Sequence, residues 1–143
     1  MNVATILKMK GRDVVTTTAD TSLLEIAKLL QQHGIGCVVI KGTDGKVAGI
    51  VSERDLVRAI GSAGVKALKD AVSDYMTRAV VTARESDTID RLMSEMSSHR
   101  FRHMPVVERG NLVGLVSIGD VVKMRIAEAE MEAAAMREYI TTG

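Results

Sequence analysis

Apolar residues recur at helical spacing in two segments, one in each half of the chain. Positions i, i+3, i+4 and i+7 are apolar in both segments, which predicts helices with one buried face. Ser22 and Glu25 have the spacing of a capping box before the first helix, and Asp87 and Thr88 precede the second. The apolar positions are Leu23, Ile26, Ala27 and Leu30 in the first segment and Ile89, Leu92, Met93 and Met96 in the second.

Short, mostly apolar runs follow each of these helices and predict pairs of strands joined by tight connections. Such runs are typical of a sheet that helices cover, so the helices that come next are expected to pack on it. A further β-prone stretch at 14–17 precedes the first helix. The runs are 37–40 and 47–51 in the first half and 104–107 and 112–116 in the second. The residues expected against the sheet are Leu56, Val57 and Ile60, and Val121, Val122 and Ile126.

A short motif is repeated where each pair of strands ends. Residues 49–55 read Gly-Ile-Val-Ser-Glu-Arg-Asp, and residues 114–120 read Gly-Leu-Val-Ser-Ile-Gly-Asp. A duplicated unit predicts two equivalent halves. Ser-x-x-Asp at a helix start is by itself a capping box, which only satisfies free backbone N–H groups. Because both copies follow a strand end, the motif also marks two equivalent helix N-termini, which favour anions and hydroxyl groups.

The helix predicted after Asp120 continues to Ile140, much further than the matching helix after Asp55. Its apolar residues recur every three or four positions, so part of an amphipathic helix extends beyond the repeat. Such a helix is expected to pack on a partner chain, and the alternative is a frayed, solvated tail. Between the halves, residues 61–64 break the chain and residues 65–71 are expected to form a brief helix. The apolar positions of the long helix are Val122, Ile126, Ala129, Ala133, Met136 and Ile140.

Composition narrows the classes of function. The core is aliphatic, because 46% of the 143 residues are hydrophobic but only two are Tyr, one is Phe and none is Trp. So few aromatic residues offer no stacking platform for nucleic acid, and 19 basic against 18 acidic residues give no field that steers the chain toward DNA or a membrane. The lone Cys37 is interpreted as a small buried hydrophobe. With no signal peptide or membrane span, we expect a cytoplasmic protein.

A cationic run at 99–103 distinguishes the second half, since the corresponding stretch of the first half reads His33-Gly34-Ile35-Gly36-Cys37-Val38. The ordinary interpretation is a solvated basic patch. The sharper hypothesis is a phosphate clamp, because arginine makes bidentate, charge-assisted hydrogen bonds. His99 and His103 have the spacing of a helical metal pair, but Pro105 and the strand that follows disfavour a helix there.

Motifs of catalysis are missing from the sequence. Gly34-Ile35-Gly36 lacks the third glycine of a dinucleotide fingerprint, and Gly45-Lys46 has no P-loop frame. No serine lies in a nucleophile elbow, and no metal cluster is evident. The sequence therefore favours a protein that is not an enzyme.

The strings at 49–55, 99–107 and 114–120, with Tyr75-Met76-Thr77, resemble a tandem pair of CBS domains, a family named after cystathionine β-synthase. The resemblance covers nearly the whole chain and is strongest to small stand-alone bacterial CBS-pair proteins. It implies a mixed α/β (α+β) fold: two β-α-β-β-α repeats packed about a pseudo-twofold axis, called a Bateman module, with an extended C-terminal helix. The expected divisions are residues 1–64 for the first repeat, 65–124 for the second and 125–143 for the helical extension.

The same resemblance implies a regulatory homodimer that binds AMP or a related adenine nucleotide in a cleft between its repeats and signals to an unknown downstream protein. ADP, ATP, NADH and S-adenosylmethionine are further possible ligands, and no cofactor or metal is required. The rivals are a structural dimer with empty clefts and a nucleotide-processing enzyme.

Carried over by position, the resemblance gives each part of the nucleotide its own candidate residues. Asp55 and Asp120 would accept hydrogen bonds from ribose, with Ser52 and Ser117 close to ribose or phosphate. The cleft of Ser52 and Asp55 is expected to be the better site, because it faces the cationic run. Backbone at Thr16 and Thr17, or Val81 and Thr82, would read adenine; Arg102 and His103, joined by Arg54, would bind phosphate; and Met104 and Pro105 are candidates for the pocket beside Asp120.

Overall fold

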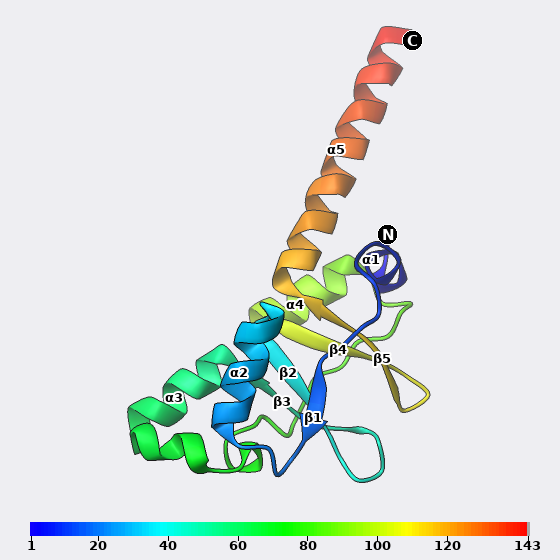
Figure 1. The fold of residues 1–143 in the computed structure, drawn as a ribbon. Coiled ribbons are helices and arrows are strands. Elements are labelled where there is room, and N and C mark those ends of the chain that lie inside the picture. The colour runs from blue at the N-terminus through cyan, green and yellow to red at the C-terminus, as the bar shows by residue number, and fades with distance from the viewer. Residues whose placement is uncertain (143) are drawn as a thin grey trace.

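The computed structural model of the chain describes residues 1–142, which form two similar halves (Figure 1). The predicted helices and strand pairs occur in the predicted order, but the N-terminal helix α1 was not predicted. The first half contains α1 (Val3–Lys10), β1 (Thr16–Thr18), α2 (Leu23–His33), β2 (Cys37–Lys41), β3 (Val47–Ser52) and α3 (Glu53–Ala63). Two short 3₁₀ helices, η1 (Val65–Lys69) and η2 (Val72–Asp74), connect the halves. The second half contains α4 (Ile89–His99), β4 (His103–Glu108), β5 (Asn111–Ser117) and α5 (Ile118–Thr142).

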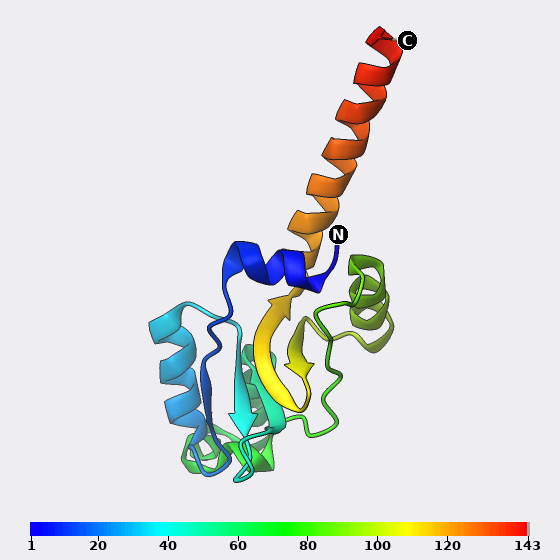
Figure 2. The same ribbon diagram turned by 90° about the vertical axis from the view of Figure 1, so that its right-hand side faces the viewer.

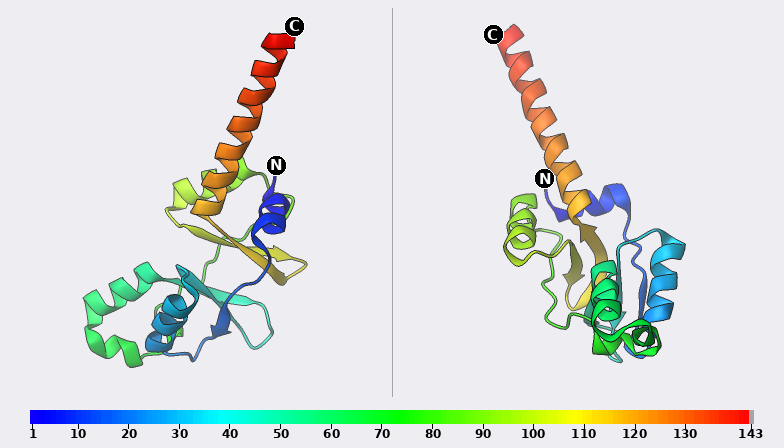
Figure 3. Two further views of the ribbon diagram at one scale, coloured as in Figure 1. Left: turned by 45° about the horizontal axis from the view of Figure 1, so that its top comes forward. Right: turned by 90° about the vertical axis from the view of Figure 1, so that its left-hand side faces the viewer.

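The sheets of the two halves differ in their number of strands: the first has three and the second has two. In the first half β2 lies between β1, which is parallel to it, and β3, which is antiparallel. In the second half β4 and β5 form an antiparallel pair, and the counterpart of β1 is reduced to a single parallel bridge between Ala83 and Val106. The two lobes lie against each other, and α5 projects away from both (Figure 3).

Each half has its own hydrophobic core, but short segments are exchanged between them. Val3, Ile6 and Leu7 of α1 are buried in the core of the second half, with residues of α4, β4 and β5. Val72 and Met76 of the connecting segment are buried in the core of the first half. Figure 2 shows α1 crossing over β5 beside the base of α5. The N-terminal helix is therefore held next to the motif of the second repeat.

Helix caps confirm the predicted helix starts. The side chains of Ser22 and Thr88 accept hydrogen bonds from the backbone N–H groups of Glu25 and Arg91, as N-cap residues do. The predicted faces of these helices are also right, because Leu23, Ile26, Ile89 and Leu92 are buried.

The predicted packing of the next two helices is only half right. Leu56 and Val121 are buried, but Val57 is 71% exposed and Ile60, Val122 and Ile126 are exposed as well. Adjacent residues of a helix point about 100° apart, so each Leu-Val or Val-Val pair turns only one member toward the sheet. Ala59 and Met124 take the next core positions instead.

Cys37 is buried in β2, as predicted, and burial raises the pKa of its thiol to about 12. The group is therefore a neutral thiol at physiological pH. Within residues 1–142, no helix is both long enough and apolar enough to cross a membrane.

Gly114 packs so closely under α1 that a larger residue does not fit. A Cβ atom there would lie 2.6 Å from Cδ2 of Leu7, which is itself buried. Gly114→Ala is expected to lower the free energy of unfolding by about 1–3 kcal/mol, measured by urea denaturation. Gly61→Ala is the matched control, because no atom lies within 4 Å of its Cβ position in α3, and it is expected to stabilise by about 0.5–1 kcal/mol. Equal effects of the two substitutions would contradict this packing.

Candidate functional site

The turn from β3 into α3 holds Ser52 and Asp55 in a complete capping box. The Ser52 hydroxyl accepts from the Asp55 N–H at 3.4 Å, and Oδ2 of Asp55 accepts from the Ser52 N–H at 2.8 Å. The Ser52 hydroxyl also donates to Oδ2, at 3.2 Å. Within residues 1–142, no hydrogen bond reaches Oδ1 of Asp55. The cap therefore occupies one carboxylate oxygen and leaves the other available to a ligand.

The equivalent turn from β5 into α5 has the same cap and an additional partner. Oδ2 of Asp120 accepts from the Ser117 N–H at 2.9 Å, and it also accepts from Nζ of Lys10 at 2.6 Å. The same ammonium donates to the carbonyl oxygen of Leu115 at 2.9 Å. Burial favours the neutral acid, but the bonds from Lys10 and Ser117 outweigh it, so the pKa of Asp120 is lowered. The two motif carboxylates are therefore in different states: Asp120 is ion-paired, whereas Asp55 has no ion-pair partner among residues 1–142.

A cavity of about 380 Å³ opens beside Ser52 and Asp55. One wall is the β3–α3 turn with Arg54 and Arg58, and the opposite wall is the segment from α4 into β4. Residues of the connecting segment complete it. The lining comprises Gly36, Cys37, Ile50, Ser52, Glu53, Arg54, Asp55, Arg58, Thr77, Ala79, Val80, Val81, His99, Arg100, Phe101, Arg102 and His103. A volume of this size is in the range of small-molecule sites.

The charged residues of the cavity lining are mostly cationic. Arg54 and Arg58 stand one turn apart on α3, and Arg100 and Arg102 come from the other repeat. The acidic residues of the lining are Glu53 and Asp55, so positive charges outnumber negative ones. Guanidinium groups that converge from two sides suit an anion with several acceptor oxygens, such as a phosphate.

The segment between α4 and β4 is shaped in a way that its counterpart is not. Arg100 follows α4 in the left-handed conformation, with φ of 57°, where Gly34 follows α2 with φ of 62°. A side chain in this conformation costs roughly 1–2 kcal/mol, which glycine avoids. The second repeat thus keeps a guanidinium beside the cavity at a cost in backbone energy, a pattern typical of functional sites.

His103 lies against Gly36, and a larger residue at position 36 would crowd its imidazole. A Cβ at Gly36 would lie 3.3 Å from both Cε1 and Nε2 of the imidazole. Burial lowers the pKa of His103, and the charges of Lys10 and Arg102 lower it further, while Glu53 and Asp120 oppose the shift. The imidazole of His103, which lines the cavity, is therefore neutral at pH 7. An anion bound beside it would raise its pKa.

The structure brings together some of the predicted site residues and separates others. Ser52, Arg54, Asp55, Val81, Arg102 and His103 line the cavity. Thr16 and Thr17 lie in β1, and Thr82 follows Val81 outside the lining. Met104 and Pro105 are buried in β4, and Met104 belongs to the core of the second half. Ser117 and Asp120 lie at the other turn, beside Lys10.

Other lining residues were not predicted from the sequence. Arg58 follows Arg54 by four residues, so helical periodicity was a signal that both share a face. Thr77, Ala79 and Val80 lie in an irregular segment with no periodicity, and only the three-dimensional structure places them.

His99 and His103 do not form a helical pair, because His99 ends α4 and His103 begins β4. His99 lies 3.3 Å from Glu95 and stacks on Phe101, with ring centroids 5.8 Å apart. Among residues 1–142, no group of three or more His, Cys, Asp or Glu side chains is arranged to hold a metal ion.

Two similar α/β lobes, with a cavity between them, define a tandem-repeat module. The CBS domain family matches residues 7–62 and 72–126, and the chain belongs to this family as a tandem pair. The structure is similar to that of a CBS-domain containing protein from Agrobacterium tumefaciens, with a TM-score of 0.84 and 49% identity over 87% of this chain and 92% of that one.

Two further similar structures were solved with ligands. A CBS domain protein from Pyrobaculum aerophilum, complexed with AMP, has a TM-score of 0.75 and 26% identity, covering 84% of this chain and 89% of that one. A CBS domain pair in complex with 5-methylthioadenosine and S-adenosyl-L-methionine has a TM-score of 0.79 and 28% identity, covering 90% of this chain and 98% of that one.

Proposed function

We propose that this CBS pair is a non-catalytic regulatory module that binds AMP, or a closely related adenine nucleotide, in the cavity beside Asp55. It acts as a homodimer and passes its signal to another protein. One observation carries the proposal: a carboxylate with a free oxygen faces guanidinium groups from the other repeat across a cavity of about 380 Å³. The similar structures with AMP and S-adenosyl-L-methionine support an adenine-containing ligand.

Each part of the ligand has a partner of matching chemistry in the lining. Oδ1 of Asp55 accepts from the ribose hydroxyls, while Oδ2 maintains the cap. Arg102 and His103, with Arg54 and Arg58, bind the phosphate. Backbone beside Val81 faces the adenine. The cationic lining favours a phosphate-bearing ligand over S-adenosylmethionine, whose sulfonium carries a positive charge.

A thermal unfolding scan with AMP, ADP, ATP, NADH and S-adenosylmethionine tests the proposal. A ligand at 100 times its dissociation constant adds about 2.7 kcal/mol of stability, which is a readable shift of Tm for a chain of this length. AMP is expected to give the largest shift. If none of the five ligands shifts Tm, the clefts are empty and the chain is a structural dimer. Conversion of ATP during a long incubation would instead indicate an enzyme.

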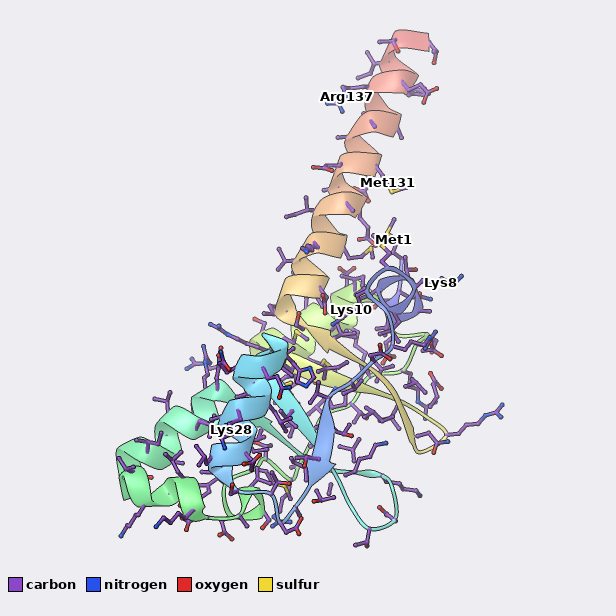
Figure 4. The ribbon with its side chains drawn as sticks, viewed as in Figure 1. Met1, Lys8, Lys10, Lys28, Met131 and Arg137 are labelled. Atoms are coloured by element: carbon purple, nitrogen blue, oxygen red, sulfur yellow. The ribbon has the colours of Figure 1, made fainter. Side chains whose placement is uncertain are left out.

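The second cleft is expected to bind nucleotide less well, because the ammonium of Lys10 neutralises the Asp120 carboxylate and weakens it as an acceptor for ribose. Lys10 bonds the capping oxygen Oδ2, so the expected effect is a loss of charge and not a blocked Oδ1. Figure 4 shows Lys10 beside the base of α5, whereas Lys8 projects from the outer side of α1. Lys10→Met frees Asp120 and is expected to tighten the second site by about tenfold, the value of one charge-assisted hydrogen bond.

Calorimetric stoichiometry measures this effect. The unaltered chain is expected to bind one nucleotide at moderate concentration, and Lys10→Met is expected to bind a second. Lys8→Met removes the same charge from α1 and is expected to leave the stoichiometry unchanged. Two equal sites in the unaltered protein would refute the role given to Lys10.

A further inference from the structure

The outer part of α5 stands clear of the rest of the molecule. Residues 129–142 are all exposed, and Figure 4 shows Met131 and Arg137 on this projecting part. An isolated helix of this length is marginally stable in water, so a partner is needed to hold it. The buried residues of α5 are Val121 and Met124, near its base, where Arg125 and Glu128 also pair with Asp90 and with the N-terminal amino group.

A second apolar stripe on α5 does not face the body. Its residues alternate in spacing between four and three, which is the heptad pattern of a coiled coil, with Ile126, Ala133 and Ile140 at a positions. All its members are exposed. At about 100° per residue, Val121 and Met124 lie more than a quarter turn away from the stripe. The stripe, here called the α5 seam, comprises Val122, Ile126, Ala129, Ala133, Met136 and Ile140.

We propose that the α5 seam pairs with the α5 seam of a second copy of this chain, in parallel and in register. The proposal deepens the homodimer of the proposed function by assigning its surface and its direction. The bodies lie on the outer sides of the helix pair, because Val121 and Met124 point away from the seam. Ala129 and Ala133 allow the two helices to approach closely.

The charges that flank the seam favour the parallel arrangement. In a parallel pair, a g position faces the e position of the next heptad on the other helix. Arg125 then faces Glu130 of the second copy, and Glu132 faces Arg137 of the second copy. Both contacts join opposite charges, and the twofold symmetry doubles them. Arg125 also contacts Asp90 at 3.1 Å and Glu128 at 3.3 Å within its own chain, yet its side chain is 52% exposed and accessible to a partner.

Antiparallel pairing satisfies either the charges or the seam, but not both. With the seams fully overlapped, Glu130 faces Glu130 and Lys123 faces Arg137, so like charges meet. If one antiparallel helix slides by one heptad so that the overlap lies nearer the bodies, opposite charges face each other across the seam. Met136 and Ile140 are then left uncovered. If the helix slides by one heptad in the other direction, away from the bodies, Val122 and Ile126 are left uncovered. Only the parallel register covers the whole seam and joins opposite charges.

Single cysteines test both the surface and the direction. In a parallel pair, the two copies of Ile140→Cys face each other within disulfide range, so mild oxidation is expected to produce a covalent dimer on a non-reducing gel. Glu138→Cys lies on the opposite side of α5 and is the matched control, expected to remain largely monomeric. The native Cys37 is buried and does not compete.

Antiparallel pairing gives a different pattern of cross-links. It would leave Ile140→Cys uncross-linked and would cross-link the double variant Val122→Cys/Ile140→Cys, which overturns the proposal. A dimer in solution whose α5 cysteines never cross-link also overturns it.

Charge reversal provides an independent measurement. The double variant Glu130→Lys/Glu132→Lys places like charges across the parallel seam and is expected to weaken the dimer at least about tenfold in sedimentation equilibrium. The variant Arg125→Glu/Arg137→Glu is expected to restore pairing when the two are mixed. An unchanged dimer would contradict the seam. Neither result depends on nucleotide: failure of AMP binding would leave the cross-links intact, and failure of the seam would leave the AMP-induced shift of Tm.

Discussion

Asp55→Ala is expected to weaken AMP binding by about tenfold to a hundredfold, because the substitution removes the charged acceptor that we propose for the ribose hydroxyls. The fold is expected to persist. Losing the capping box of α3 costs about 0.5–2 kcal/mol, which is a fraction of the stability of a domain of this size. Titration calorimetry measures the affinity, and urea unfolding measures the cost in stability.

Asp120→Ala is the matched control within the same molecule. It removes the equivalent cap of α5 together with the ion pair to Lys10, so its cost in stability is expected to be similar. AMP binding at the first cleft is expected to be unchanged. If both substitutions weaken binding equally, the two carboxylates contribute only to folding. If Asp55→Ala alone unfolds the chain, Asp55 is chiefly a cap.

Arg102→Ala is expected to weaken AMP binding by about tenfold to a hundredfold while leaving adenosine binding unchanged, because the proposed contact of its guanidinium is with the phosphate alone. Arg102 is exposed, so the free energy of unfolding is expected to change by less than about 0.5 kcal/mol. Competition between AMP and adenosine in calorimetry isolates the phosphate contribution.

Lys28→Ala controls for the general loss of one positive charge. Lys28 lies on α2, outside the cavity lining, and its Nζ lies 3.4 Å from Oε1 of Glu25. Its removal is expected to leave the affinity for AMP unchanged. An equal loss of affinity for AMP and adenosine in Arg102→Ala would mean that Arg102 shapes the cavity and does not bind phosphate.

Local signals in the sequence predicted much of this structure. The spacing of Leu23, Ile26 and Leu30 places α2, and the repeated Ser-x-x-Asp places the starts of α3 and α5. Such features depend on residues within one or two turns of a helix. The predicted face of α3 was half wrong at Val57, because periodicity alone does not decide which of two adjacent apolar residues faces the sheet.

The long-range features were beyond sequence reasoning. Nothing near Lys10 or Asp120 in the chain indicates that they meet, since their contact depends on α1 crossing to the second repeat. The cationic run at 99–103 suggested a phosphate site, but its juxtaposition with Arg58 required the packing of the two repeats. The ligand roles of the individual residues remain predictions.

The structure of the protein crystallised with AMP tests the central claim most directly. The account predicts AMP beside α3, with its ribose hydroxyls on Oδ1 of Asp55 and its phosphate between Arg102 and the arginines of α3. The same crystals are expected to show Lys10 still paired with Asp120. AMP bound only at Asp120, or an unoccupied cavity at saturating AMP, would contradict the account.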